Sequence, residues 1–255
     1  MRIIDNYAYT NALRQVDPTQ KGGLALLAIL LCLLLDRPAV GLLTLGWMFA
    51  FTALWARIPP LVFGRILLAE GLFLALSVLG VAISAGFEPP AASVAAWWFG
   101  PLWIGASQET LARAARLLTR ALGCAAALNF LILTTPLTDL IVLLRRLRLP
   151  EALIDLMIIT YRSIFVLLES LQRMACAQDT RLGYSNVRRA MRSAGLLGSQ
   201  LFIDAYRRSQ RMQVALESRG LDGPLRVLPL TYRFDRLVWW LGVMMMVSLL
   251  IVGVL

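Results

Sequence analysis

Long apolar runs alternate with short polar segments over most of the chain, and one basic segment of about a hundred residues interrupts them. A helix needs roughly 20 mostly apolar residues to cross a membrane. Five runs reach or approach that length: Gly22–Leu35, which is short, and Pro38–Ala56, Ile66–Phe87, Ala121–Leu137 and Leu237–Leu255. The pattern therefore predicts an all-α integral membrane protein with about five transmembrane helices.

A sixth apolar run, Ala91–Ser107, has a different composition. It contains Trp97, Trp98 and Trp103 together with a Gly-Pro pair. Tryptophan is enriched where membrane meets water. We expect this run to lie at the outer membrane surface or to dip into it, and a sixth span is the alternative.

The distribution of arginine predicts the orientation. Sixteen arginines lie between Thr138 and Arg236, and cytoplasmic segments carry the excess of basic residues. Five spans also place the N-terminus inside, with 21 of the 25 basic residues cytoplasmic, whereas six spans would leave 17 inside. Five spans fit better. Arg113, Arg116 and Arg120 then precede the fourth span on the outer side, and we expect them to line a face buried in protein.

Composition agrees with this division. Hydrophobic residues make up 59% of the chain and the formal net charge is +10, so apolar and charged residues must be segregated. The polar first 21 residues predict no cleaved signal peptide. Of the basic residues only Lys21 is a lysine, which fits either a GC-rich genome or a preference for forked hydrogen bonds.

Candidate chemistry is sparse. The chain has no histidine, and Cys32, Cys124 and Cys176 are far apart in sequence, which excludes a CxxC metal site and a disulfide framework. We predict no catalytic residue, metal ligand set or cofactor. No phosphate-binding G-x-x-x-x-G-K-[ST] loop occurs, so ATP would have to be hydrolysed by another chain.

The basic segment is helical by its apolar spacing. One helix is expected to begin near Pro136, a second covers about 151–181 after Pro150, and a third covers about 187–219. We divide the chain into residues 1–135, the N-terminal region and transmembrane helices; 136–236, cytoplasmic amphipathic helices; and 237–255, a C-terminal transmembrane helix.

A short sequence echo marks two of the expected helix ends. Ala177–Arg181 and Ala215–Arg219 share the pattern Ala-x-acid-hydroxyl-Arg, and glycine follows within two residues, at Gly183 and Gly220. A cation and a left-handed glycine at a helix C-terminus would explain one copy by capping alone. Two copies are harder to assign to capping alone, and such ends could dock into equivalent pockets of a partner.

At this point the chain resembles a known family. The Ala-x-x-x-Arg pair in a basic helical segment between spans resembles the transmembrane T component of energy-coupling-factor (ECF) transporters. Leu133–Leu140 and Arg145–Pro150 resemble the family pattern that precedes its coupling region. The N-terminal Asp5–Tyr9, followed by Pro18-x-x-Lys21, is similar to the cobalt-uptake (CbiQ-like) subgroup.

The resemblance covers essentially the whole chain and implies a role. A T component links a substrate-binding membrane subunit to two ABC-type ATPase subunits and transmits their motion. The implied ATPase-coupling interface consists of Ala177, Asp179, Arg181, Ala215, Glu217, Arg219 and Gly220. One departure stands out: the second copy reads Arg-Gly as in the family, whereas the first reads Arg181-Leu182-Gly183, so the first contact is expected to be shaped differently.

The implied function is cobalt ion uptake across the bacterial inner membrane, with the N-terminus and coupling helices cytoplasmic and no catalytic activity in this chain. Uptake of nickel or of a vitamin is the alternative. The arginines are also expected to contact anionic lipids. Nucleic-acid binding is not expected for a segment tethered between spans.

A few isolated residues admit other interpretations. Glu70 is either an interface anchor or an ion site, and Asp139 fits the first turn of a helix. Met244–Met246 fit packing or lipid contact better than metal binding. An intramembrane enzyme is the rival function, with Ser84, Ser93 or Ser107 as nucleophile, but none has a base at a recognisable spacing.

Overall fold

The computed structural model describes residues 7–82, 84–86, 93–99, 102–220 and 232–254. The chain divides into two compact units. Met1–Leu140 and Leu230–Leu255 form the first, here called the membrane unit, and Ile141–Pro229 form the second, here called the hairpin unit. Asp5 and Asn6 of the N-terminal motif lie outside the described residues.

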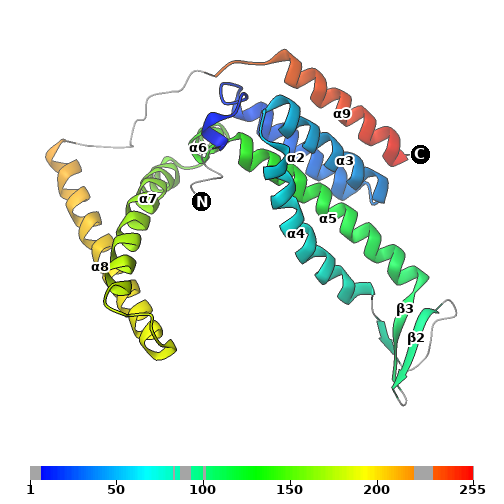
Figure 1. Cartoon of the computed structure of the whole chain (residues 1–255). Helices are drawn as coiled ribbons and strands as arrows, with labels where there is room; N and C mark the ends of the chain where they lie inside the picture. Colours follow the sequence, from blue (N-terminus) through cyan, green and yellow to red (C-terminus); the bar gives the residue numbers. More distant parts are fainter. Residues whose placement is uncertain (1–6, 83, 87–92, 100–101, 221–231, 255) are drawn as a thin grey trace. The chain divides into compact units, whose positions relative to one another are not determined.

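The membrane unit is predominantly helical, which confirms the predicted fold class (Figure 1). Its helices are α2 (Pro18–Leu34), α3 (Pro38–Ala50) with its π-helical continuation η1 (Phe51–Trp55), α4 (Pro60–Ala82), α5 (Gln108–Thr134) and α9 (Arg236–Val254). Proline is the first residue of α2, α3 and α4, where its missing N–H is no loss and its fixed φ suits a helix.

Four helical segments are long and apolar enough to cross a membrane by length and composition: Pro38–Trp55, Pro60–Val81, Gln108–Thr134 and Arg236–Gly253. The fifth run forms α2, a shorter apolar helix of 17 residues. At about 1.5 Å per residue α2 is about 25 Å long, somewhat less than the hydrocarbon core of a bilayer. The count of five spans stays a prediction.

The three arginines expected to precede the fourth span lie within α5 itself, because this helix begins at Gln108. Arg120 is half-buried: its guanidinium donates to the Leu33 carbonyl at 2.6 Å and to the Asp36 carboxylate at 3.3 Å. Arg113 and Arg116 are exposed, so the prediction of a buried face is right in part for Arg120 and wrong for the other two.

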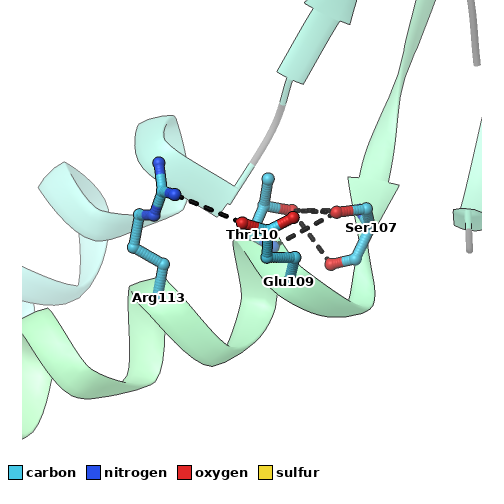
Figure 2. A network of polar contacts seen from close by, with 4 residues as sticks. All are labelled: Ser107, Glu109, Thr110 and Arg113. Carbon is cyan, nitrogen blue, oxygen red and sulfur yellow. Dashed lines mark hydrogen bonds and ion pairs between the residues drawn. The ribbon is translucent and has the colours of Figure 1, made fainter. Parts of the chain in front are cut away.

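Local polar residues determine where α5 begins (Figure 2). The Ser107 hydroxyl accepts from the Thr110 backbone N–H at 3.2 Å, and the Thr110 hydroxyl accepts from the Ser107 N–H at 3.0 Å. This reciprocal cap satisfies two N–H groups that a helix start leaves without a partner. Arg113 adds an exposed ion pair with Glu109 at 3.3 Å.

A small antiparallel sheet, which the sequence did not predict, precedes α5. It consists of β1 (Ser84–Gly86), β2 (Ser93–Phe99) and β3 (Leu102–Ser107), in the order β1-β3-β2. Trp98 pairs with Trp103 and Ala96 with Gly105. In the described residues of this apolar run, 93–99 and 102–107, strands take the place of a helix, so the alternative of a sixth helical span is wrong.

The core of the membrane unit lies between α2, α3, α4, α5 and α9. It includes Ala28, Met48, Phe63, Phe130, Leu133 and Leu249, each nearly inaccessible to solvent. The α3–α5 crossing depends on two glycines. A Cβ on Gly41 would overlap the backbone of Thr119, and one on Gly123 would lie 2.9 Å from the Gly41 carbonyl oxygen. Glycine thus permits close backbone approach of these two helices.

The hairpin unit contains most of α6 (Leu137–Arg146), together with α7 (Glu151–Asp179) and α8 (Val187–Ser218), and the last two run in opposite directions (Figure 1). The predicted second and third helices are therefore present, each ending one or two residues earlier than expected. Their burial is low: in the described part of this unit the buried residues are Ile141, Ile154, Ser170 and Ser193.

Candidate functional site

The first copy of the sequence echo forms the C-terminal end of α7. The Thr180 hydroxyl donates to the Ala177 carbonyl at 3.0 Å, and the Arg181 N–H donates to the Gln178 carbonyl at 3.2 Å. The Leu182 N–H then donates to the Asp179 carbonyl at 2.9 Å. These bonds tighten the last turn and satisfy carbonyls that a helix end leaves open.

The second copy forms the end of α8 with the same bonds. The Ser218 hydroxyl donates to the Ala215 carbonyl at 3.0 Å, and the Arg219 N–H to the Leu216 carbonyl at 3.1 Å. The Gly220 N–H donates to the Glu217 carbonyl at 3.0 Å. The echo in sequence is therefore also an echo in backbone geometry, position by position.

Both copies place the residue after the arginine in the left-handed region. Gly220 has φ +65°, as the predicted glycine cap requires. In the first copy this residue is Leu182, with φ +57°, and not Gly183. Capping by a left-handed glycine therefore explains the second copy but not the first, where a leucine occupies the left-handed position at some cost.

Gly183 has a different role, in the turn between α7 and α8. Its N–H donates to the Gln178 carbonyl at 2.9 Å, and its own carbonyl accepts from the buried Ser193 hydroxyl at 3.0 Å. A Cβ at this position would lie 2.8 Å from both the Gln178 carbonyl oxygen and the Ser193 Oγ. Glycine is needed here for close approach. The first helix end is thus held against α8.

All seven residues of the predicted interface are exposed: Ala177, Asp179, Arg181, Ala215, Glu217, Arg219 and Gly220. Within the part of the chain that the structure describes, no side-chain hydrogen bond or ion pair engages Arg181 or Arg219. Glu217 accepts from the Gln213 amide at 3.0 Å. The structure does not bring the two copies together, since α8, with 32 residues and about 48 Å of length, lies between them.

A basic groove lies between α7 and α8 beside the second copy. It has a volume of about 890 Å³, and its lining includes Ala215, Glu217 and Arg219 of the predicted interface. Three further arginines line it: Arg162 from α7, and Arg208 and Arg211 from α8. No sequence pattern predicted this groove, because it forms only when the two helices pack.

A polar contact fixes the crossing of α7 and α8. The Ser170 hydroxyl is buried and accepts from Arg208 of α8 and Arg173 of α7, each at 3.3 Å. The Arg208 Nε also donates to Asp204 at 3.0 Å, and this hydrogen bond lowers the pKa of Asp204 below its ordinary value of 3.8. A lone serine in an apolar stretch was the only sequence signal for this contact.

The other singled-out residues have structural partners. Glu70 of α4 accepts from the Asn129 amide of α5 at 2.7 Å, which joins two helices. Asp139 lies in the first turn of α6, as predicted, and is 3% exposed. The Ser107 hydroxyl caps α5. Met245 is buried whereas Met244 and Met246 are exposed, in agreement with packing and lipid contact.

Two cysteines from different helices lie close together in the fold. The thiol of Cys32 on α2 donates to the Arg120 carbonyl of α5 at 3.6 Å and lies beside Gly123, the neighbour of Cys124; both cysteines are free. Two of the three cysteines therefore lie near one another in space, although they are far apart in sequence. In the described residues, no group of three or more His, Cys, Asp and Glu side chains lies together as a metal ligand set would.

Taken together, helices that are long and apolar enough to cross a membrane define a multi-pass membrane protein, and an exposed, arginine-bearing helical hairpin is part of the same chain. The sequence profile of the CbiQ family, described as cobalt transport protein, matches residues 10–229. The chain belongs to this family.

Individual relatives extend over most of the chain. The cobalt transport protein CbiQ of Rhodobacter capsulatus is 35% identical over 218 residues, which cover 86% of this chain and 83% of that protein. CbiQ of Salmonella typhimurium is 28% identical over 88% of this chain and 98% of its own length. A putative fused cobalt transport protein CbiMQ of Methanocorpusculum labreanum is 29% identical over 87% of this chain and 37% of that protein.

Proposed function

We propose that this chain is the transmembrane coupling component of an ECF-type ABC importer for cobalt ions. It would join two ABC-type ATPase subunits to a substrate-binding membrane subunit and transmit motion between them. Membership of the cobalt transport protein family supports the substrate. The relative whose name joins CbiM and CbiQ in one chain supports a membrane-embedded partner.

The observation that carries the proposal is the pair of matching helix ends. Each presents an exposed arginine immediately before a left-handed residue, on a turn with the same hydrogen bonds. An exposed guanidinium on a fixed turn is suited to charge-assisted, forked hydrogen bonds with acidic or carbonyl groups of a partner. Two such ends, separated by α8 with its length of about 48 Å, suit a partner that has two equivalent grooves.

The surface of the hairpin unit also favours a partner. Large apolar side chains are exposed along α7 and α8, among them Leu153, Leu156, Met191, Leu196, Phe202 and Tyr206. Extended exposed apolar surface on an extramembrane helix marks an interaction site. ATPase subunits seated on the arginine ends would cover part of this surface, and the membrane and its lipids would be adjacent to the rest.

In this mechanism the ATPases hold Arg181 and Arg219 and move them when ATP closes the ATPase pair. The long helices α7 and α8 carry that displacement to their connections with the membrane unit. The membrane helices then shift the substrate-binding subunit between two arrangements. The excess of arginine in the hairpin unit supports a cytoplasmic location, on the side where ATP is available.

The experiment that tests the function is purification of the tagged chain from its native host in gentle detergent, followed by mass spectrometry and reconstituted uptake. We expect two ABC ATPases and a multi-span membrane protein to co-purify, and ATP-dependent uptake of Co²⁺ into proteoliposomes. Uptake of Ni²⁺ or of a vitamin instead would correct the substrate alone. Recovery of the chain without any ATPase, under conditions that preserve other membrane complexes, would overturn the proposal.

A further inference from the structure

The only lysine of the chain, Lys21, is completely buried in the first turns of α2. Its ammonium donates to the carbonyl oxygens of Leu13 at 3.1 Å and Thr134 at 3.0 Å. A buried ammonium is costly unless it is hydrogen-bonded, so this position has a strict requirement for its two carbonyl partners. The side chain is built into the interior and is not a surface charge.

One of the two carbonyls that Lys21 binds, that of Thr134, belongs to the last residue of α5. The last carbonyls of a helix have no partner within the helix, and its negative end favours a cation. The Asn11 amide assists by donating to the Leu133 and Thr134 carbonyls, each at 3.3 Å. The N-terminal segment therefore caps the end of α5 with two side chains.

The same place is where the chain leaves the membrane unit, after Leu140. Asp139, in the first turn of α6, is close enough to Lys21 to attract its charge. The buried Asp139 carboxylate accepts from the Tyr232 hydroxyl at 3.2 Å. Tyr232 lies just after the point where the chain returns to the membrane unit, at Leu230.

The returning connection is bound to the N-terminal segment as well. The Arg233 N–H donates to the Gln15 carbonyl at 2.8 Å, and the Asp17 N–H to the Arg233 carbonyl at 3.2 Å. The Gln20 side-chain amide both donates to the Asp235 carbonyl, at 3.3 Å, and accepts from its N–H, at 3.2 Å. One short segment thus binds both connections to the hairpin unit.

We propose that five residues of this segment form a clasp that ties both connections of the hairpin unit to α2, α5 and α9: Asn11, Gln15, Asp17, Gln20 and Lys21. Lys21 is its positioning residue. A displacement of the hairpin helices then moves three membrane helices together. If the connections were loose, they would bend and the membrane helices would stay in place. Lys21 acts through the carbonyls that it binds and touches no transported ion. The inference rests on the proposed coupling function and adds the element that makes coupling efficient.

The test compares Co²⁺ uptake per ATP hydrolysed in proteoliposomes that contain the full transporter. The first variant is Lys21→Met, which keeps the apolar stem and removes the ammonium. The second is Gln20→Leu with Tyr232→Phe, which removes three hydrogen bonds to the connections and leaves Lys21 in place. Arg14→Ala is the matched control, since the guanidinium of this exposed arginine of the same segment donates to the Tyr9 carbonyl and stacks on the Tyr9 ring, and Tyr9 belongs to neither connection.

We expect Lys21→Met transporters to assemble and hydrolyse ATP while uptake per ATP falls about tenfold or more, with a smaller fall for the double variant and none for Arg14→Ala. An assembled Lys21→Met transporter with a wild-type ratio overturns the clasp. If Lys21→Met does not assemble, the double variant decides: a wild-type ratio there overturns it. If the wild-type chain itself binds no ATPase, the proposed coupling function is wrong, and this result is seen before any variant is compared.

Discussion

The two units of this protein differ in how many of their residues are buried: many in the membrane unit, few in the hairpin unit. The membrane unit has a core of inaccessible side chains, closed by glycine contacts between α3 and α5 and by the capped end of α5. The hairpin unit has two helices of 29 and 32 residues, and only three residues of these helices are buried. The proposed coupling function accounts for this contrast, because a unit that transmits the motion of a partner must leave surface open for that partner.

The largest effect is expected at the α3–α5 crossing. Gly41→Ala would place a methyl group against the backbone of Thr119 on α5, which cannot move aside as a flexible side chain would. We expect the variant to lose about 3 kcal/mol of stability, at the upper end for overpacking. Thermal unfolding of the chain in detergent measures this loss.

Gly46→Ala is the matched control on the same helix, because nothing lies within 4 Å of a Cβ at Gly46. Its stability should change by no more than about 0.5 kcal/mol. Equal unfolding temperatures for the two variants would mean that the crossing is not closely packed.

A smaller loss is expected in the hairpin unit, at the turn between α7 and α8. Gly183→Ala would bring a Cβ to 2.8 Å from the Ser193 Oγ and the Gln178 carbonyl. The cost should be about 1–2 kcal/mol, because the turn can open toward solvent. Protease resistance of the hairpin reports it, with Gly198→Ala, which meets nothing within 4 Å, as control. Faster cleavage of the control variant would contradict the assignment.

The two left-handed residues should respond with opposite signs. Gly220→Ala introduces a Cβ at φ +65° and should destabilise the end of α8 by about 1 kcal/mol. Leu182→Gly removes a Cβ at φ +57° and should relieve a similar strain at the end of α7. The gain in stability is reduced by the conformational entropy that glycine adds to the unfolded chain. Local hydrogen exchange at both ends measures the signs. A gain in stability for Gly220→Ala would refute the shared geometry.

The smallest effect is the pH dependence of the Asp204–Arg208 pair. Because the hydrogen bond lowers the pKa of Asp204 in the folded state, its stabilisation is present above the ordinary value of 3.8 and is lost as the pH falls through the lowered value. The unfolding temperatures of wild type and Asp204→Asn should therefore differ at neutral pH and converge below about pH 4. A difference in unfolding temperature that stays constant from neutral pH to below about pH 4 would exclude the ionisation of Asp204 as its cause.

Sequence patterns predicted what depends on local chemistry. Apolar runs located the helices, Pro150 located the start of α7, and the Ala-x-acid-hydroxyl-Arg echo identified two ends with the same turn. These features depend on residues within a turn of one another, so they can be found without knowledge of the fold.

Features that depend on packing were missed. The burial of Lys21 requires carbonyls from residues 13 and 134, and the contact of Cys32 with the Arg120 carbonyl requires α2 to lie against α5. The left-handed Leu182 was missed for another reason: the adjacent Gly183 fits a cap by residue type, whereas tertiary contact with Ser193 is what requires it. Charge counting also could not show that Arg120 caps α2.

The most direct test of the account is the affinity of the ATPase subunits for the chain in nanodiscs, with Arg181→Ala, Arg219→Ala and their combination. Arg192→Ala, an exposed arginine in the interior of α8, is the control. Loss of a charge-assisted contact at an interface costs about 2–5 kcal/mol, so each end variant should weaken binding about 30-fold or more and the control should not. Binding of the double variant within twofold of wild type would contradict the claim that these two helix ends hold the ATPases.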